Sequence, residues 1–145
     1  MLPEIEESID LEVLDIGRAA SLLLQCESAT QITVEGNAVD GLRDRLAPHI
    51  LPGLIDEAVI DSSGEPSSAA TFRLNDDVTR AIEPLLGLDD WSIFHVNLHT
   101  DSEWLIQGYD WGDGCCALRI AASAASCAES LVAAGAARPW ADHKD

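Results

Sequence analysis

Two histidines are the residues of this 145-residue chain whose spacing most resembles a metal site. His95 and His99 form an H-x3-H pattern, which on a helix presents two imidazoles to one zinc ion. However, Phe94, Val96 and Leu98 alternate with the polar residues, and this alternation predicts a strand. Four residues of a strand span about 13 Å, which one metal ion cannot bridge. We therefore expect no metal here.

A cysteine nucleophile is the other chemistry that the residues suggest. Cys115 would need His95 or His99 as its base, but the expected strand pairing places Cys115 beside Asp110. An acidic neighbour raises the pKa of a thiol, which disfavours a nucleophile. The chain also lacks a G-x-G-x-x-G loop, a Walker lysine and a G-x-S-x-G elbow. The leading interpretation is a protein that is not an enzyme and uses no cofactor. An enzyme using His95, His99 and Asp110 is an alternative.

Acidic and aromatic residues collect between positions 89 and 113. No Lys or Arg occurs between Arg80 and Arg119, so these acids are not neutralised locally. Trp104 and Trp111 are expected to be exposed beside them, and aromatic residues ringed by charge often anchor protein interfaces. Alternatively, Trp104 belongs to the core and the acids are solvated turn residues. The predicted partner-binding residues are Asp89, Asp90, Asp101, Glu103, Asp110, Trp111 and Asp113.

The charge of the whole chain restricts its partners. It has 26 Asp and Glu against 8 Lys and Arg, a formal net charge of −18. This balance argues against binding to nucleic acids, whose phosphates need clustered cations, and against anionic membrane surfaces. It allows a basic protein partner. With 47% apolar residues, the chain is too hydrophobic for an intrinsically disordered acid.

The N-terminus and the cysteines indicate the compartment. The first residues are acidic, whereas a secretory signal is basic and then apolar, and no apolar stretch approaches the roughly 20 residues of a membrane span. Cys26 and Cys127 lie in Ala- and Leu-rich helical sequence, which favours buried thiols over disulfides. We therefore expect a cytoplasmic protein with no membrane contact.

The periodicity of apolar residues predicts the elements. Helices are expected near 16–24, 39–46, 76–87 and 121–134, with caps at Asp15 or Asp10 and at Asn75 or Asp76. Pro84 is expected to break the third helix. Strands are expected at 31–35, 58–61 and 70–74, separated by a Ser-, Gly- and Pro-rich loop at 62–68.

Three further runs, 91–100, 104–110 and 115–120, predict an antiparallel meander. Its expected pairs place Leu98 opposite Leu105, Val96 opposite Gln107 and Phe94 opposite Tyr109 on the core side. The opposite face is expected to be mixed, carrying His95, Asn97, His99, Trp104, Ile106, Gly108, Asp110, Cys115, Ala117 and Arg119.

Together these elements predict an α+β fold. It is a mainly antiparallel sheet of five or six strands, including the C-terminal three-strand meander at about 91–120, packed with three or four helices. The length fits one domain, 1–145, and residues 1–10 and 136–145 are expected to be loose termini.

Two segments resemble parts of known families. Leu14-Asp-Ile-Gly-Arg-Ala-Ala and Ile32-Thr-Val-Glu-Gly-Asn-Ala-Val resemble a STAS domain, the fold of anti-sigma-factor antagonists. That resemblance implies a parallel pairing between strands 32–35 and 72–74, and a regulatory module in a signalling complex. At the family's phosphoswitch position this chain has Arg43 and Asp44 in place of Asp and Ser or Thr. The segment from Phe94 to Trp111 resembles hairpins of some small bacterial immunity proteins. The chain is assigned to neither family.

The leading functional hypothesis is a small acidic binding protein that neutralises or holds a basic protein partner, as an immunity protein or inhibitor does. The first alternative is a STAS-like regulatory module without a phosphorylatable Ser or Thr, and the second is the histidine enzyme. Acidity that serves only solubility is a further alternative. The oligomeric state is not predicted.

Overall fold

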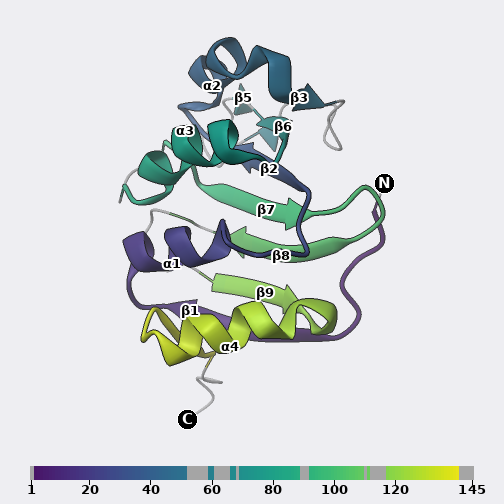
Figure 1. Ribbon diagram of the computed structural model, residues 1–145, viewed down its shortest axis with the longest axis vertical. Helices are drawn as coiled ribbons and strands as arrows, with labels where there is room; N and C mark the ends of the chain where they lie inside the picture. The colour runs from purple at the N-terminus through teal and green to yellow at the C-terminus, as the bar shows by residue number, and fades with distance from the viewer. Residues whose placement is uncertain are drawn as a thin grey trace.

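The computed structural model describes residues 2–51, 59–60, 66–67, 69–88, 92–109, 111 and 117–140. The fold is α+β, as predicted, with four helices and one large antiparallel sheet (Figure 1). The helices are α1 (Ile16–Leu23), α2 (Val39–Arg45), α3 (Asp76–Leu86) and α4 (Ala125–Ala133), with 3-10 turns η1 (Ala47–His49) and η2 (Ala122–Ala124). The strands of the large sheet are β1 (Ser8–Val13), β2 (Gln31–Glu35), β3 (Ile50–Leu51), β6 (Ala69–Arg73), β7 (His95–His99), β8 (Trp104–Tyr109), β9 (Ala117–Ala121) and β10 (Ala137–Pro139). A separate pair consists of β4 (Val59–Ile60) and β5 (Pro66–Ser67).

The large sheet has eight strands in the order β10-β1-β9-β8-β7-β2-β6-β3, so the predicted five or six is too few. All its neighbouring strands are antiparallel. β1 and β10 were not among the predicted strands, because β1 begins within and β10 lies wholly within the ends expected to be loose termini. These strands pair with each other, and β1 also pairs with β9. The two ends of the chain therefore close one side of the sheet.

The pairing of β2 with β6 does not match the STAS topology. Ile32 lies opposite Phe72, and Thr33 lies opposite Thr71, in an antiparallel ladder. The STAS resemblance implies a parallel pairing of these two strands. The likeness of the N-terminal segment therefore does not extend to the fold.

The predicted meander exists, but its register is correct at one end only. His99 lies opposite Trp104, which the predicted pairing of Leu98 with Leu105 implies, whereas Leu98 itself lies opposite Ile106. The register shifts by one residue between Leu98 and His99, so Leu105 is the extra residue of a β-bulge. A shift by one residue exchanges the faces of the strand.

Beyond the bulge, the face assignments of β8 are therefore corrected. Ile106 and Gly108 lie opposite Leu98 and Val96 on the core side. Gln107 and Tyr109, which were expected on the core side, lie on the other face.

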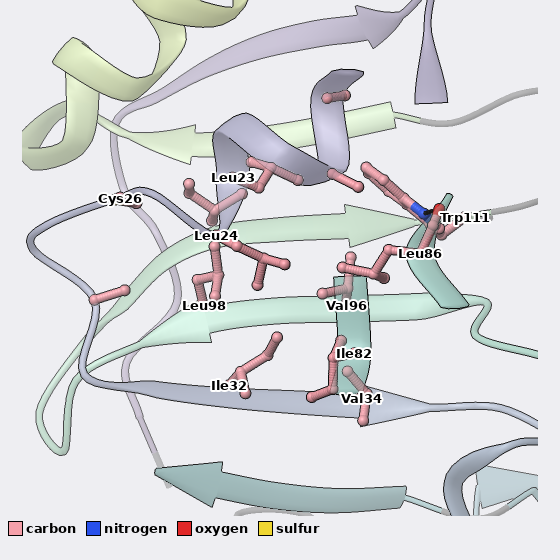
Figure 2. Packing of buried hydrophobic residues seen from close by; sticks show 14 of the residues in the cluster. Leu23, Leu24, Cys26, Ile32, Val34, Ile82, Leu86, Val96, Leu98 and Trp111 are labelled. Atoms are coloured by element: carbon pink, nitrogen blue, oxygen red, sulfur yellow. Dashed lines mark hydrogen bonds between the residues drawn. The ribbon is translucent and has the colours of Figure 1, made fainter. Parts of the chain in front are cut away.

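All four helices contribute to one buried cluster on one face of the sheet. Figure 1 shows α1, α3 and α4 lying over the same side of the sheet, and α2 lies near its β6 end. Leu23 of α1, Ile82 and Leu86 of α3, and Leu131 of α4 are fully buried. The strands contribute residues to the same cluster, among them Ile32, Val34, Val96 and Leu98 (Figure 2). The apolar face of each strand is therefore the face that the helices cover.

Local sequence signals place the helix ends. Asp15 accepts a hydrogen bond from the backbone N–H of Arg18, and Asn75 accepts one from that of Val78, as expected of N-caps. Contrary to the prediction, α3 continues through Pro84 to Leu86. Only Leu85 and Leu86 follow the proline in the helix, and Leu86 is fully buried, so packing maintains the helix there.

Gly36, which follows β2, makes a close backbone approach that no side chain allows. Its φ is +157°, and a Cβ at this position would meet the backbone oxygen of Ser92 and lie 2.7 Å from the Cα of Ile93. We expect Gly36→Ala to lower the free energy of unfolding by about 3 kcal/mol or more, measured by urea denaturation. Gly41 in α2 is the control, because a Cβ there meets nothing within 4 Å. Gly41→Ala should raise stability by about 0.5–1 kcal/mol, and equal losses in both variants would contradict this account.

Candidate functional site

A row of polar side chains crosses the face of the sheet that the helices leave uncovered. Successive cross-strand pairs align these residues from β1 to β6, and antiparallel partners share a face. We call them the polar row: Asp10, Arg119, Gln107, Asn97, Thr33 and Thr71. No helix of the described residues packs on this face. The polar row is therefore a candidate binding surface.

The exposure of the polar row changes along its length. Asp10 and Arg119 are exposed, Gln107 and Asn97 are half-buried, and Thr33 and Thr71 are buried. One end can therefore meet a partner or ligand directly, and the other end cannot.

At the buried end, hydroxyl and imidazole groups form a directed chain of hydrogen bonds. The Thr33 and Thr71 hydroxyl oxygens are 2.7 Å apart, and Thr33 Oγ1 lies 2.8 Å from His99 Nε2. His99 Nδ1 lies 2.9 Å from the carbonyl oxygen of Thr100, which only accepts, so Nδ1 carries the proton. Neutral His99 therefore accepts from Thr33 at Nε2, and Thr33 accepts from Thr71.

His99 is well placed to remain neutral. Its side chain is fully buried, and this burial lowers the pKa of its imidazole, although the hydrogen bond to Thr100 opposes the shift. The ring of Trp104 packs edge-on against it, with ring centroids 4.9 Å apart. With both ring nitrogens engaged and no exposed surface, His99 has the features of a structural residue.

Glu35 and His95 form a second polar pair on this face, at opposite positions of β2 and β7. Glu35 is 4% exposed, and burial raises the pKa of its carboxyl, while the nearby His95 opposes that shift. His95 Nδ1 is buried without a hydrogen-bond partner among the described atoms. The His95 ring also contacts Tyr109 edge-on, with centroids 5.9 Å apart. The histidine is therefore held between a buried carboxyl group and an aromatic ring.

At the exposed end, two aromatic side chains flank an ion pair. Tyr109 and Trp140 are 39% and 44% exposed, and they line a shallow pocket of about 180 Å³ with Asp10 and Arg119. Arg119 Nε lies 3.5 Å from Asp10 Oδ1. The Tyr109 hydroxyl donates to Gln107 Oε1 at 2.9 Å, which fixes the ring over the polar row. Neither Tyr109 nor Trp140 was among the predicted site residues.

A further ion pair lies beside this pocket. Arg138 Nε donates to Glu12 Oε2 at 2.8 Å, and this contact raises the pKa of the Arg138 guanidinium. The arginines of β9 and β10 are thus paired with carboxylates of β1. These arginine charges are therefore largely compensated on the candidate surface.

The turn between β7 and β8 carries two of the predicted partner-binding residues, Asp101 and Glu103. Thr100 Oγ1 accepts hydrogen bonds from the backbone N–H groups of Ser102 and Glu103, at 3.2 and 3.1 Å. The Thr100 backbone N–H also donates to the Glu103 carbonyl at 3.0 Å. Asp101 and Glu103 are exposed, and neither forms an ion pair with another described residue. The turn therefore presents, on an ordered backbone, two carboxylates that no described residue pairs with.

The expectation that Trp111 is exposed is wrong. Its side chain is 0% exposed, and its indole Nε1 donates to the carbonyl oxygen of Leu86 at 2.6 Å, at the C-terminus of α3 (Figure 2). Trp111 therefore joins the sheet to α3 within the core. Trp104 is half-buried, which lies between the two alternatives of an exposed anchor and a core residue. The remaining predicted residues, Asp89, Asp90, Asp110 and Asp113, lie outside the described residues.

Comparison with known proteins gives no further guidance, because no family model, curated protein or solved structure matches this chain. Within the described residues, no group of three or more His, Cys, Asp or Glu side chains could hold a metal ion. None of the described helices is long and apolar enough to cross a membrane.

Thr33 should be the critical member of the buried hydrogen-bond chain, because it bonds to both neighbours. Thr33→Val leaves His99 Nε2 and the Thr71 hydroxyl without their partner and should cost about 2 kcal/mol of unfolding free energy. Thr71→Val is the matched control, since it removes one terminal donor and should cost about 1 kcal/mol or less. Chemical denaturation of both variants measures the difference. Equal costs would contradict the proposed direction of the chain.

Glu35 should make stability depend on pH. Since its pKa is higher in the folded state than in the unfolded state, the folded state binds more protons between the two pKa values. The contribution of Glu35 to the free energy of unfolding therefore falls as the pH rises through that interval. We expect Glu35→Gln to be more stable than the parent at pH 7 and to lose this part of the pH dependence, measured by thermal denaturation from pH 4 to 8.

The control for this experiment is Glu103→Gln, which removes the same charge at an exposed position. It separates the effect of burial from the general relief of self-repulsion in an acidic chain. An equal gain in stability in both variants would contradict the assignment to Glu35.

Proposed function

We propose that this protein binds a basic protein partner and holds or neutralises it, in the manner of an inhibitor or immunity protein. The net charge of −18 supports a charge-steered association, because a strong field of one sign accelerates encounters with an oppositely charged surface. Steering of this kind sets the rate of association more than the final affinity. The docking surface must therefore also supply contacts that fix the partner.

The observation that carries the proposal is the pair of exposed carboxylates at the β7–β8 turn. Thr100 orders the backbone at Asp101 and Glu103. The turn would therefore lose little conformational freedom when a partner binds. Their side chains make no ion pair with the described residues that binding would have to break. Lys or Arg residues of a partner can therefore pair with them directly.

Tyr109 and Trp140 supply the aromatic anchors that were expected at Trp104 and Trp111. Both are partly exposed on the helix-free face, and large aromatic side chains contribute much of the binding energy at protein interfaces. Arg119 and Arg138 lie close by, but each is paired with a carboxylate of β1. Repulsion of a basic partner by these two arginines is therefore reduced.

Capture from a lysate of the native organism tests this proposal. The parent chain and Asp101→Lys/Glu103→Lys serve as baits at about 50 mM and 500 mM salt, with bound proteins identified by mass spectrometry. We expect the parent to retain a basic protein that weakens at high salt, because screening shortens the range of the charges. The double variant should lose at least about tenfold in affinity for the captured protein in a binding titration.

The matched control is Asp44→Lys/Glu129→Lys, which changes the net charge equally at exposed positions of α2 and α4. This variant should keep most of the affinity, because only the overall field changes. Equal losses in both double variants would reject the turn as a docking site. No specific basic protein at either salt concentration would reject the proposed function itself.

A further inference from the structure

Two cysteines from distant parts of the chain lie unusually close together. Cys26 follows α1 and Cys127 lies in α4, 101 positions later, and their Sγ atoms are 2.7 Å apart. Non-bonded heavy atoms normally rest at roughly 3.5–4.0 Å. Both are free thiols in the structure, as the sequence analysis predicts. A small movement of the two side chains would bring the sulfur atoms to bonding distance.

The surroundings place this pair at the edge of the helix layer. Cys26 is buried at the rim of the hydrophobic cluster (Figure 2), whereas Cys127 is half-buried. A groove of about 270 Å³ opens beside them, and its polar lining residues are Gln25, Glu27, Ser28, Ser126 and Ser130. The pair is therefore packed against the core on one side and open to small molecules on the other.

We propose that Cys26 and Cys127 are a site of reversible oxidation, at which a low-molecular-weight disulfide converts the two thiols into an intramolecular disulfide. This inference does not depend on the proposed function, because the pair lies at the helix layer and not on the helix-free face.

The chemistry is two successive thiol–disulfide exchanges. Cys127, the more accessible thiol, loses its proton and attacks one sulfur of the oxidant, which releases one thiolate and leaves a mixed disulfide. Cys26, as its thiolate, then attacks the Cys127 sulfur and releases the second thiolate. Two electrons pass from the protein to the oxidant, and the two released thiolates take up the two protons. The oxidant is thereby reduced to two thiols.

The environment of Cys127 controls how fast this reaction begins. Burial and the neighbouring Cys26 raise the pKa of the Cys127 thiol to about 12. Since the thiolate is the attacking species, the first exchange should be slow at neutral pH and accelerate in alkaline solution. The pair should therefore respond to sustained oxidising conditions more than to brief ones.

The bond would join the turn after α1 to α4. These two helices lie next to each other in Figure 1 and are in contact. Because the cross-link would close a loop of about a hundred residues, it should restrict the unfolded chain strongly. Oxidation should therefore raise the melting temperature, by about 10 °C for a domain of this size.

The test uses the full chain with Cys115 and Cys116 replaced by serine, so that only the two relevant thiols remain. The protein is incubated with an excess of glutathione disulfide, and free thiols are then alkylated and counted by mass spectrometry. We expect the loss of both thiols, a cross-linked peptide containing Cys26 and Cys127 in the monomer, and a higher melting temperature that dithiothreitol reverses.

Cys26→Ser and Cys127→Ser in the same background are the controls, with folding checked by circular dichroism. Cys127→Ser should leave Cys26 largely unmodified, while Cys26→Ser should stop at a mixed disulfide on Cys127. The proposal is overturned if both thiols of the parent remain alkylatable, or if the parent also stops at a mixed disulfide with no cross-linked peptide. Cross-linking only between chains would overturn it equally.

Discussion

The antiparallel ladder of the eight-stranded sheet is the constraint on which the rest of the molecule depends. Because side chains alternate along each strand, a register that places Ile32, Val96 and Leu98 against the helices also places Thr33, Asn97 and His99 on the opposite face. Burial of the apolar residues is the main driving force for folding, and it fixes this register. The polar row is therefore a consequence of how the core is built. Any binding site on it inherits a rigid frame.

The two faces of the sheet accordingly differ in composition and in the interactions that they form. The helix side holds the large apolar cluster, in which Trp111 connects the sheet to Leu86 through its indole N–H. The other face holds buried polar groups that must satisfy one another, as Thr33, Thr71 and His99 do. Among the described residues of this face, the exposed aromatic side chains lie at the end near β1 and β10. The proposed binding and the stability of the fold therefore involve different residues of one sheet.

Much of this architecture could be predicted from the sequence, and the errors have identifiable causes. Caps at Asp15 and Asn75 are local signals, so the starts of α1 and α3 were predicted correctly. The alternation from Ile9 to Val13 is an equally local strand signal, but the surrounding acids obscured it. The bulge at Leu105 depends on the cross-strand pairing, which periodicity alone does not reveal.

The candidate site was harder to predict than the fold. Trp111 and Trp140 are both aromatic residues beside acids or chain ends, and sequence context does not say which one packs under α3. That distinction depends on the tertiary position of Leu86, whose carbonyl oxygen accepts the Trp111 hydrogen bond. The partner of Trp140 is β1, since its backbone N–H donates to the Asp10 carbonyl at 2.9 Å. Contacts between the two chain ends are long-range, and a single sequence contains no direct signal of them.

The distribution of carboxylates bears on whether the acidity serves binding or only solubility. Among the described carboxylates, Glu35 alone is buried, and the two arginine pairs of the sheet use Asp10 and Glu12. Most of the others are exposed at turns, helix surfaces and the N-terminal segment, where water and salt limit their mutual repulsion. Solubility alone requires only that such charges be dispersed. The ordered turn at Asp101 and Glu103 goes further, because its backbone is fixed around two carboxylates that no described cation neutralises. Among the described carboxylates, charge and a fixed geometry therefore coincide at this turn, which is the reason that we propose it as the docking site.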